Sequence, residues 1–279
     1  FDDPFVRHRA RVRPMRILVA DDQAANRLVL QRMLERAGHQ PVFAEDGEQA
    51  LERLERESLD AAIVDLHMPV LDGMEVLRQA RVMQAGGTRT PIVVLSADAT
   101  VDAVREAEAA GAYSFLTKPV VASRLLETLA EIAGGGQDEA PAPRKEVSTA
   151  LRTDVLEELA GLGLGQGFLR DFSEQCLRDA SRCLAEAERA ASAGQWEGVR
   201  EAAHALKGVS ENLGAQALVE RSTEIMRASD AVLAREWRRY LGVLGTQLEG
   251  TAAQVRREVA RIATPNLQGE NRPPDHESG

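Results

Sequence analysis

Five short apolar runs alternate with longer segments of helical periodicity over the first half of the chain. The runs lie at 16–20, 40–44, 60–64, 91–95 and 113–116. The helical segments cover 24–37, 47–57, 73–84, 101–110 and 122–133. Strands that are continuously apolar are buried on both faces, and strand–helix alternation produces a parallel sheet between two helix layers. The pattern predicts an α/β domain over 15–133.

The number of elements in this domain narrows its topology. Five strands that alternate with five helices over 15–133 fit a flavodoxin-like, doubly wound, five-stranded parallel sheet. Crossovers between parallel strands are right-handed, which leaves few other topologies. Gly38 and Gly111 stand where two of the helices should stop, as expected of a helix C-terminus.

The second half of the chain has no strand pattern. Apolar residues recur at three- and four-residue spacing, and helices are predicted near 151–160, 167–193, 195–212, 214–229 and 231–262. Loops around Gly194, Gly214 and Asp230 are short, so sequential helices should be antiparallel neighbours. We expect an all-α helix bundle over 150–263.

Three polar segments flank these domains. Residues 1–14 are dotted with arginine and are interpreted as a solvated connector. Residues 134–149 contain three glycines and two prolines and are interpreted as a flexible linker. Residues 264–279 are predicted to be a disordered tail. The chain begins with Phe1 rather than Met, which suggests a piece of a longer protein.

Composition excludes some functions. The net charge of −10 argues against nucleic acid as a partner, because binding to a phosphate backbone needs clustered positive charge. The sequence has no run of 18 apolar residues, so no direct membrane insertion is expected. Cys176 and Cys183 should lie roughly 10 Å apart on one helix, too far for a disulfide, and are predicted to be buried thiols.

Polar residues gather at the ends of the predicted strands. Asp21 and Asp22 follow the first run, Asp65 the third, Ser96 the fourth and Lys118 the fifth. The carboxyl ends of parallel strands share one edge, where ligands bind. Carboxylates 4 Å apart repel by about 4 kcal/mol at an effective dielectric of ~20, and Mg²⁺ would remove that cost. Acids at single strand ends often only cap helices, but this series in sequence order favours a site.

The residues of this site resemble those of the receiver domain of response regulators. The resemblance rests on Asp21-Asp22, Asp65, Met68-Pro69, Asp72-Gly73, Ser96-Ala97 and Lys118-Pro119. It implies that Asp65 is the phosphoacceptor and that Mg²⁺ is held by Asp21, Asp22, Asp65 and the backbone carbonyl of His67. It also implies that Ser96 and Lys118 bind the phosphoryl group and that Phe115 reorients as a switch. The His67 ring is not expected to bind metal, because no other histidine or cysteine is near.

A histidine lies in the middle of the helical half. Lys207 and Gly208 follow His204 by three and four residues, so all three share one helix face. Glycine inside a helix costs about 1 kcal/mol relative to alanine, and here it would leave the imidazole open to a docking domain. Lys207 would place a positive charge beside an incoming phosphoryl group. The stretch 203–215 resembles the histidine phosphotransfer (HPt) domain, whereas His8, His39 and His276 are interpreted as incidental.

Together the two halves resemble the C-terminal part of a hybrid sensor histidine kinase of the bacterial quorum-sensing, diffusible-signal-factor type. The resemblance implies a phosphorelay from an upstream phosphohistidine to Asp65, then to His204, then to the aspartate of a downstream response regulator. It also implies that an upstream kinase core belongs to the same full-length protein, and that this part lies on the cytoplasmic side of the inner membrane. The chain itself carries no ATP-binding kinase core.

Other interpretations of the same residues compete with the relay. The receiver could act as a stoichiometric module that binds and releases a partner enzyme according to the phosphorylation of Asp65. A phosphatase with a nucleophilic aspartate would need a second acid where His67 stands. The glycine-rich stretch 161–167 could cradle a phosphate, but a nucleotide loop should follow a strand, so a flexible turn is predicted there.

Overall fold

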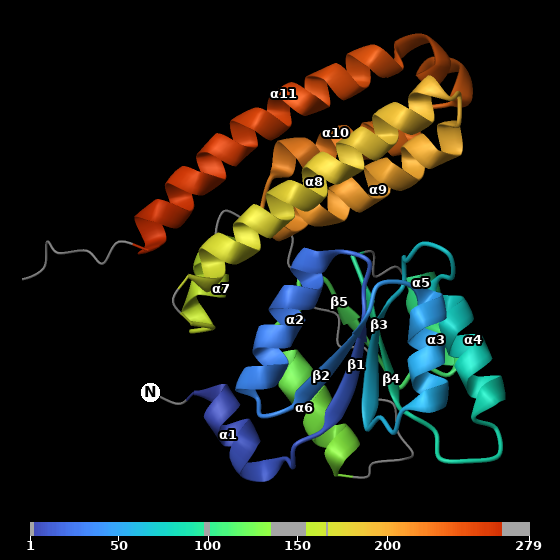
Figure 1. Ribbon diagram of the computed structural model, residues 1–279, viewed down its shortest axis with the longest axis vertical. Coiled ribbons are helices and arrows are strands. Elements are labelled where there is room, and N and C mark those ends of the chain that lie inside the picture. Colours follow the sequence, from blue (N-terminus) through green and yellow to red (C-terminus); the bar gives the residue numbers. More distant parts are fainter. Residues whose placement is uncertain (1–2, 98–100, 135–154, 166, 264–279) are drawn as a thin grey trace, which may run out of the picture.

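The computed structural model describes residues 3–97, 101–134, 155–165 and 167–263. The predicted linker beyond Gly134, the predicted tail and His276 lie outside the described residues. The described chain forms an α/β domain and a helix bundle, and Figure 1 shows the bundle lying over one end of the sheet.

The α/β domain has the predicted topology. Its five strands pair in parallel in the order β2-β1-β3-β4-β5, which is the flavodoxin-like order. The strands are β1 Arg16–Ala20, β2 Gln40–Ala44, β3 Ala61–Asp65, β4 Ile92–Ser96 and β5 Ser114–Thr117. Three of the five end one residue later than predicted. Asp65 and Ser96 are the last residues of β3 and β4, because the ladder continues through these buried polar residues.

Alternate strand residues supply two separate cores. Ile17 and Val19 of β1 point to one face, where α2 and α6 pack, and Leu18 and Ala20 point to the other, against α3, α4 and α5. This alternation is the two-residue period of a β-strand. The helices are α2 Ala24–Arg36, α3 Gly47–Arg56, α4 Gly73–Met83, α5 Val101–Ala110 and α6 Ala122–Ala133. Figure 1 shows the two layers on either side of the sheet.

The N-terminal segment is not wholly a solvated connector. It forms helix α1 (Pro4–Arg11), capped by the Asp3 side chain, and α1 packs against α6. Phe5 and His8 are buried, although the arginines that suggested solvation are exposed. The apolar positions were too few to stand out among the charges, and so the amphipathic pattern was missed.

His8 and His39 are structural partners rather than incidental residues. His39 Nδ1 accepts a hydrogen bond from the Met15 amide at 3.2 Å, so its proton lies on Nε2. That Nε2–H then donates to Nε2 of His8 over 2.8 Å. Both rings are buried, and the pair therefore fastens α1 to the domain in its neutral form.

The second half of the described chain is helical, as predicted. Its helices are α7 Val155–Gly161, α8 Phe168–Ser192, α9 Trp196–Asn212, α10 Gln216–Arg227 and α11 Asp230–Ala263. The last four pack as a bundle around one apolar core. Cys176 and Cys183 lie in that core as free thiols, and burial raises the pKa of Cys183 to about 12. None of the described helices is apolar over a length that could cross a membrane.

The histidine pair makes the stability of the α/β domain depend on pH. Burial, and then the neighbouring His8, lowers the pKa of His39 to about 4. The unfolded chain therefore takes up a proton below its ordinary pKa of 6.5, whereas the folded chain stays neutral until about 4. The contribution of His39 to the free energy of unfolding should fall by about 2 kcal/mol between pH ~7.5 and ~5, so over this range wild type should lose that much stability relative to a variant without the imidazole. Urea unfolding of wild type and His39→Gln at both pH values would measure it, and an equal fall in both proteins would contradict it.

Candidate functional site

The carboxylates predicted to meet at the sheet edge do so. Asp21 and Asp22 follow β1 and Asp65 ends β3, and carboxylate oxygens of the three lie within 4.8 Å of one another. Asp21 is fully buried and Asp65 is 4% exposed. Three carboxylates this close together, two of them buried, repel strongly, so a positive charge is required among them.

Lys118 supplies that charge in this structure. Its Nζ donates to Asp21 Oδ2 and to Asp65 Oδ2, both at 2.7 Å. Burial alone would lower the pKa of the ammonium, but the Asp21 and Asp65 charges outweigh it and raise the pKa. Lys118 is thus held protonated and bridges β1 to β3 from the end of β5.

The negative charge that Lys118 leaves unbalanced on the three carboxylates explains why a cation would fit among them. Burial, and then the charge of Asp21, raises the pKa of Asp22 to about 6, and burial also raises the pKa of Asp65 against the opposing Lys118 ammonium. A divalent cation would stabilise the ionised forms of both. The donor set is made only of oxygens, which is the set that Mg²⁺ prefers. The residues present therefore fit Mg²⁺.

The loop after β3 holds Asp65 in place. Asp72 caps α4 by accepting from the Glu75 amide at 2.8 Å. A Cβ on Gly73 would lie 2.3 Å from the backbone oxygen of Asp65, so the close packing of α4 on the strand end requires glycine. The His67 amide donates to Asp65 Oδ1 at 3.4 Å. The Asp72-Gly73 pair is thus explained by the close packing of α4 on the strand end that carries Asp65.

Ser96 and Phe115 occupy different places. Ser96 is fully buried at the end of β4, beside Asp65 in the sheet order. Phe115 lies within β5 and packs on the face of the sheet covered by α3, α4 and α5. It is therefore part of a core rather than of the carboxylate cluster, and its role as a switch stays a prediction.

His204 lies opposite the carboxylate cluster. Its ring and the ring of His67 have centroids 4.5 Å apart and are tilted by 51°. One cleft between the domains includes residues of both sites: Asp22, Asp65, His67 and Lys118 from the α/β domain, and Arg182, His204 and Lys207 from the bundle. The sequence did not determine whether the bundle docks on its own α/β domain, and here it does.

The neighbours of His204 differ from what was expected. Lys207 pairs with Glu211 at 3.6 Å, so part of its charge is already balanced within α9. Gly208 faces the α/β domain, where a Cβ would lie 3.2 Å from Nε2 of Gln23. The missing side chain thus makes room for Gln23 of the docked domain. The sequence argument gave it another role, that of leaving the His204 ring open, which stays a prediction.

Sequence reasoning missed the residues that join the domains. The polar contacts lie at both ends of α2: Gln23 and Ala25 at its start, and Arg36, which donates to the Leu162 carbonyl, in its last turn. Gln23 Nε2 donates to the Ala205 carbonyl at 3.2 Å, and the Ala25 amide donates to Asp179 Oδ2 at 3.2 Å. The side chain of Gln23, the N-cap residue of α2, makes no capping hydrogen bond. The Asp179 carboxylate of the bundle therefore serves as an anionic cap for this helix of the α/β domain.

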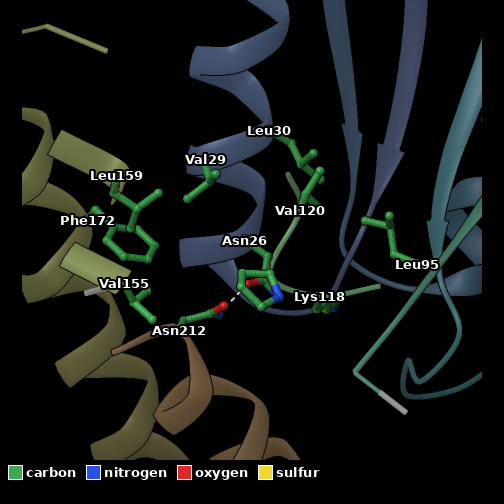
Figure 2. A pocket seen from close by; sticks show the side chains of 11 residues that line it. Asn26, Val29, Leu30, Leu95, Lys118, Val120, Val155, Leu159, Phe172 and Asn212 are labelled. Atoms are coloured by element: carbon green, nitrogen blue, oxygen red, sulfur yellow. Dashed lines mark hydrogen bonds between the residues drawn. The ribbon is translucent and has the colours of Figure 1, made fainter. Parts of the chain in front are cut away.

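Apolar contacts continue the interface along α2. Ala25 belongs to the core of the bundle, and Val29 packs against that core. Figure 2 shows Val29 of α2 next to Leu159 of α7 and Phe172 of α8, around a small cavity at this boundary. None of these residues carries a motif, which is why the sequence did not reveal them.

Replacement of Lys118 should change how the site responds to Mg²⁺. In wild type the ion must displace Lys118 from two carboxylates, and in Lys118→Met it need not. We expect the ion-free variant to have a melting temperature several degrees lower than wild type, and Mg²⁺ to raise that temperature more in the variant. Thermal unfolding with EDTA and with Mg²⁺ measures both, with Lys207→Met as the matched control. Equal Mg²⁺ shifts in wild type and Lys118→Met would contradict the displacement.

Comparison with protein families matches both halves of the chain. The response regulator receiver domain matches residues 17–130, and the Hpt domain matches residues 171–263. The receiver domain of the sensor histidine kinase PA1611 of Pseudomonas aeruginosa, solved with a magnesium ion in its active site cleft, is 33% identical. The alignment covers 44% of this chain and 99% of that one, with a TM-score of 0.41.

Curated relatives match over both domains. The sensory/regulatory protein RpfC of Xanthomonas campestris pv. campestris is 51% identical over 255 residues, which is 89% of this chain and 35% of that protein. The sensor histidine kinase AruS of Pseudomonas aeruginosa is 32% identical over 84% of this chain and 23% of that protein. The chain thus spans about a third or less of the length of these relatives. It joins a response regulator receiver domain to an Hpt domain, which is the receiver–HPt part of a hybrid sensor kinase.

Proposed function

We propose that this chain performs two consecutive steps of a phosphorelay. Asp65 takes a phosphoryl group from an upstream phosphohistidine and passes it to His204, which delivers it to the aspartate of a separate response regulator. The observation that supports this path best is the shared cleft, which both Asp65 and His204 line and in which the His67 ring lies beside the His204 ring.

In the first step a carboxylate oxygen of Asp65 forms a bond to phosphorus while the N–P bond of the donor breaks. The donor imidazole keeps the electron pair, so an acyl phosphate and a neutral histidine result. The Lys118 ammonium, which bridges Asp21 and Asp65, can move its hydrogen bonds to the phosphoryl oxygens. Mg²⁺, held by Asp21, Asp22, Asp65 and the His67 carbonyl, would neutralise charge on the transferred group.

In the second step an unprotonated ring nitrogen of His204 attacks the same phosphorus and the Asp65 carboxylate leaves. Both phosphorylated forms are high in energy, so the step can run in either direction and needs no ATP. The Gln23 and Asp179 contacts hold α9 and α8 against the receiver, which turns the transfer into a reaction between fixed groups.

The docked arrangement must open for the relay to be completed. The HPt domain covers the cleft that an upstream phosphohistidine needs to reach Asp65, and the receiver covers His204, which must reach a second aspartate. The composition of segment 134–149, with its glycines and prolines, predicts a linker that would allow both movements. In the full-length protein we place this part on the cytoplasmic side of a membrane-anchored quorum-sensing kinase. Binding of a partner enzyme by the receiver stays a separate prediction.

Labelling with radioactive acetyl phosphate and Mg²⁺ tests the path. Wild type should carry an alkali-labile label, typical of an acyl phosphate, together with an alkali-stable label, typical of phosphohistidine. Asp65→Ala should carry neither, and His204→Gln only the first. Alkali-stable label on Asp65→Ala would mean that His204 is filled by another route and would contradict the order of steps.

Replacement of Gly208 by a larger residue should separate the effect on domain docking from the effect on helix stability. Gly208→Leu places a side chain where Gln23 lies, and it also removes a glycine that costs α9 about 1 kcal/mol. We expect transfer from Asp65 to His204 to slow at least tenfold while the melting temperature does not fall. Gly250→Leu, at a position with nothing near the Cβ, is the matched control. Transfer at the wild-type rate would show that α9 does not approach Gln23.

A further inference from the structure

Asn26, in the first turn of α2, touches both the carboxylate cluster and the HPt domain. Its Nδ2 donates to Asp21 Oδ1 and to Asp21 Oδ2, each at 3.0 Å. Its Oδ1 accepts a hydrogen bond from Asn212 Nδ2 at 2.6 Å. Figure 2 shows the two amides directed toward each other. Asn26 and Asn212 are each 8% exposed, so water does not readily replace either bond.

Asp21 determines which way the Asn26 amide points. An ionised carboxylate only accepts hydrogen bonds, so the NH₂ group of Asn26 must face it. A flipped amide would place its oxygen against two carboxylate oxygens in a buried site. The carbonyl of Asn26 is thereby forced to face the HPt domain, and a group that meets it there has to be a hydrogen-bond donor.

Asn212 provides this donor away from the reaction centre. It is the last residue of α9 and follows His204 by just over two helical turns, about 12 Å along the axis. The contact therefore touches neither the phosphoryl group nor the attacking nitrogen. It can determine which helix docks, and how far along the receiver that helix lies, without taking part in the chemistry.

We propose that the Asn26–Asn212 pair is a specificity determinant by which this receiver accepts its own HPt domain. The receiver selects a phosphotransfer helix that has a hydrogen-bond donor just over two turns after its histidine, and it rejects one with a carboxylate there. Asn212 acts as a positioning residue, because its effect on transfer passes through docking. The inference rests on the proposed transfer between Asp65 and His204.

The test changes the donor and little else. Asn212→Asp keeps the size of the side chain and replaces the NH₂ group by an acceptor that meets the Asn26 carbonyl. Gln216→Glu makes the same chemical change four residues later, at an exposed position outside the interface, and controls for added charge. Asn212→Ser shortens the side chain but keeps a donor. Circular dichroism of each variant of the 279-residue chain confirms that the helices are kept.

Two measurements are made on each protein. The rate of transfer to His204 is measured in a single turnover and expressed per labelled Asp65. Small-angle X-ray scattering reports how closely the two domains are docked, in the absence of phosphoryl donor. We expect Asn212→Asp to transfer at least tenfold more slowly and to be more extended than wild type. Asn212→Ser should lie between the two, and Gln216→Glu should match wild type.

The outcomes separate the two proposals. Wild-type transfer and wild-type compactness in Asn212→Asp would overturn the specificity role, as would an equal loss in Gln216→Glu or a loss in Asn212→Ser as large as that in Asn212→Asp. If wild type itself moves no label from Asp65 to His204, the proposed function fails. The scattering comparison of wild type with Asn212→Asp then still determines whether the pair controls docking.

Discussion

Three carboxylates held at one edge of a buried sheet are the constraint on which the rest of this structure depends. Asp21, Asp22 and Asp65 lie within 4.8 Å of one another and would repel without a counter-charge. Lys118 reaches them from β5 and bonds two of the three. The same repulsion that makes the site costly to fold makes it receptive to a divalent cation. In the proposed transfer, Lys118 would be the positive charge that binds the oxygens of the phosphoryl group.

The first turn of α2 links this charged site to the docking surface. Arg27 holds the Asp21 backbone carbonyl at 2.7 Å, and Gln23 and Asn26 hold the Asp21 side chain. Gln23 and Asn26 also contact the HPt domain. Two residues that hold the Asp21 carboxylate thus also contact the HPt domain, so a single side chain, that of Asn26, connects the carboxylate cluster to Asn212 of α9.

The interface has the properties of a contact that must form and break. Its polar part includes single hydrogen bonds from Gln23, Ala25, Arg36 and Asn212 and the contact between the His67 and His204 rings, and its apolar part is a strip along α2. Individual hydrogen bonds contribute only about 0.5–1.5 kcal/mol each, because water competes for the same groups when the domains separate. In the proposed relay each domain also has to meet another partner, the receiver an upstream donor and the HPt domain a downstream regulator, and a modest affinity between the two domains would allow that exchange.

The sequence by itself determined the element types, the sheet topology and the identity of the carboxylate site. Periodicity is a local property, and residues at the ends of parallel strands are brought together by topology alone, so Asp21, Asp65 and Lys118 could be located without coordinates. It also indicated His204 as a candidate site and Gly208 as a residue that needs an explanation. Only the tertiary structure decided that α1 is buried through Phe5 and His8 and that the HPt domain lies on its own receiver. Asn26 and Asn212 are 186 residues apart, and their contact depends on the matching shape and polarity of two folded surfaces, for which the chain carries no periodic signal.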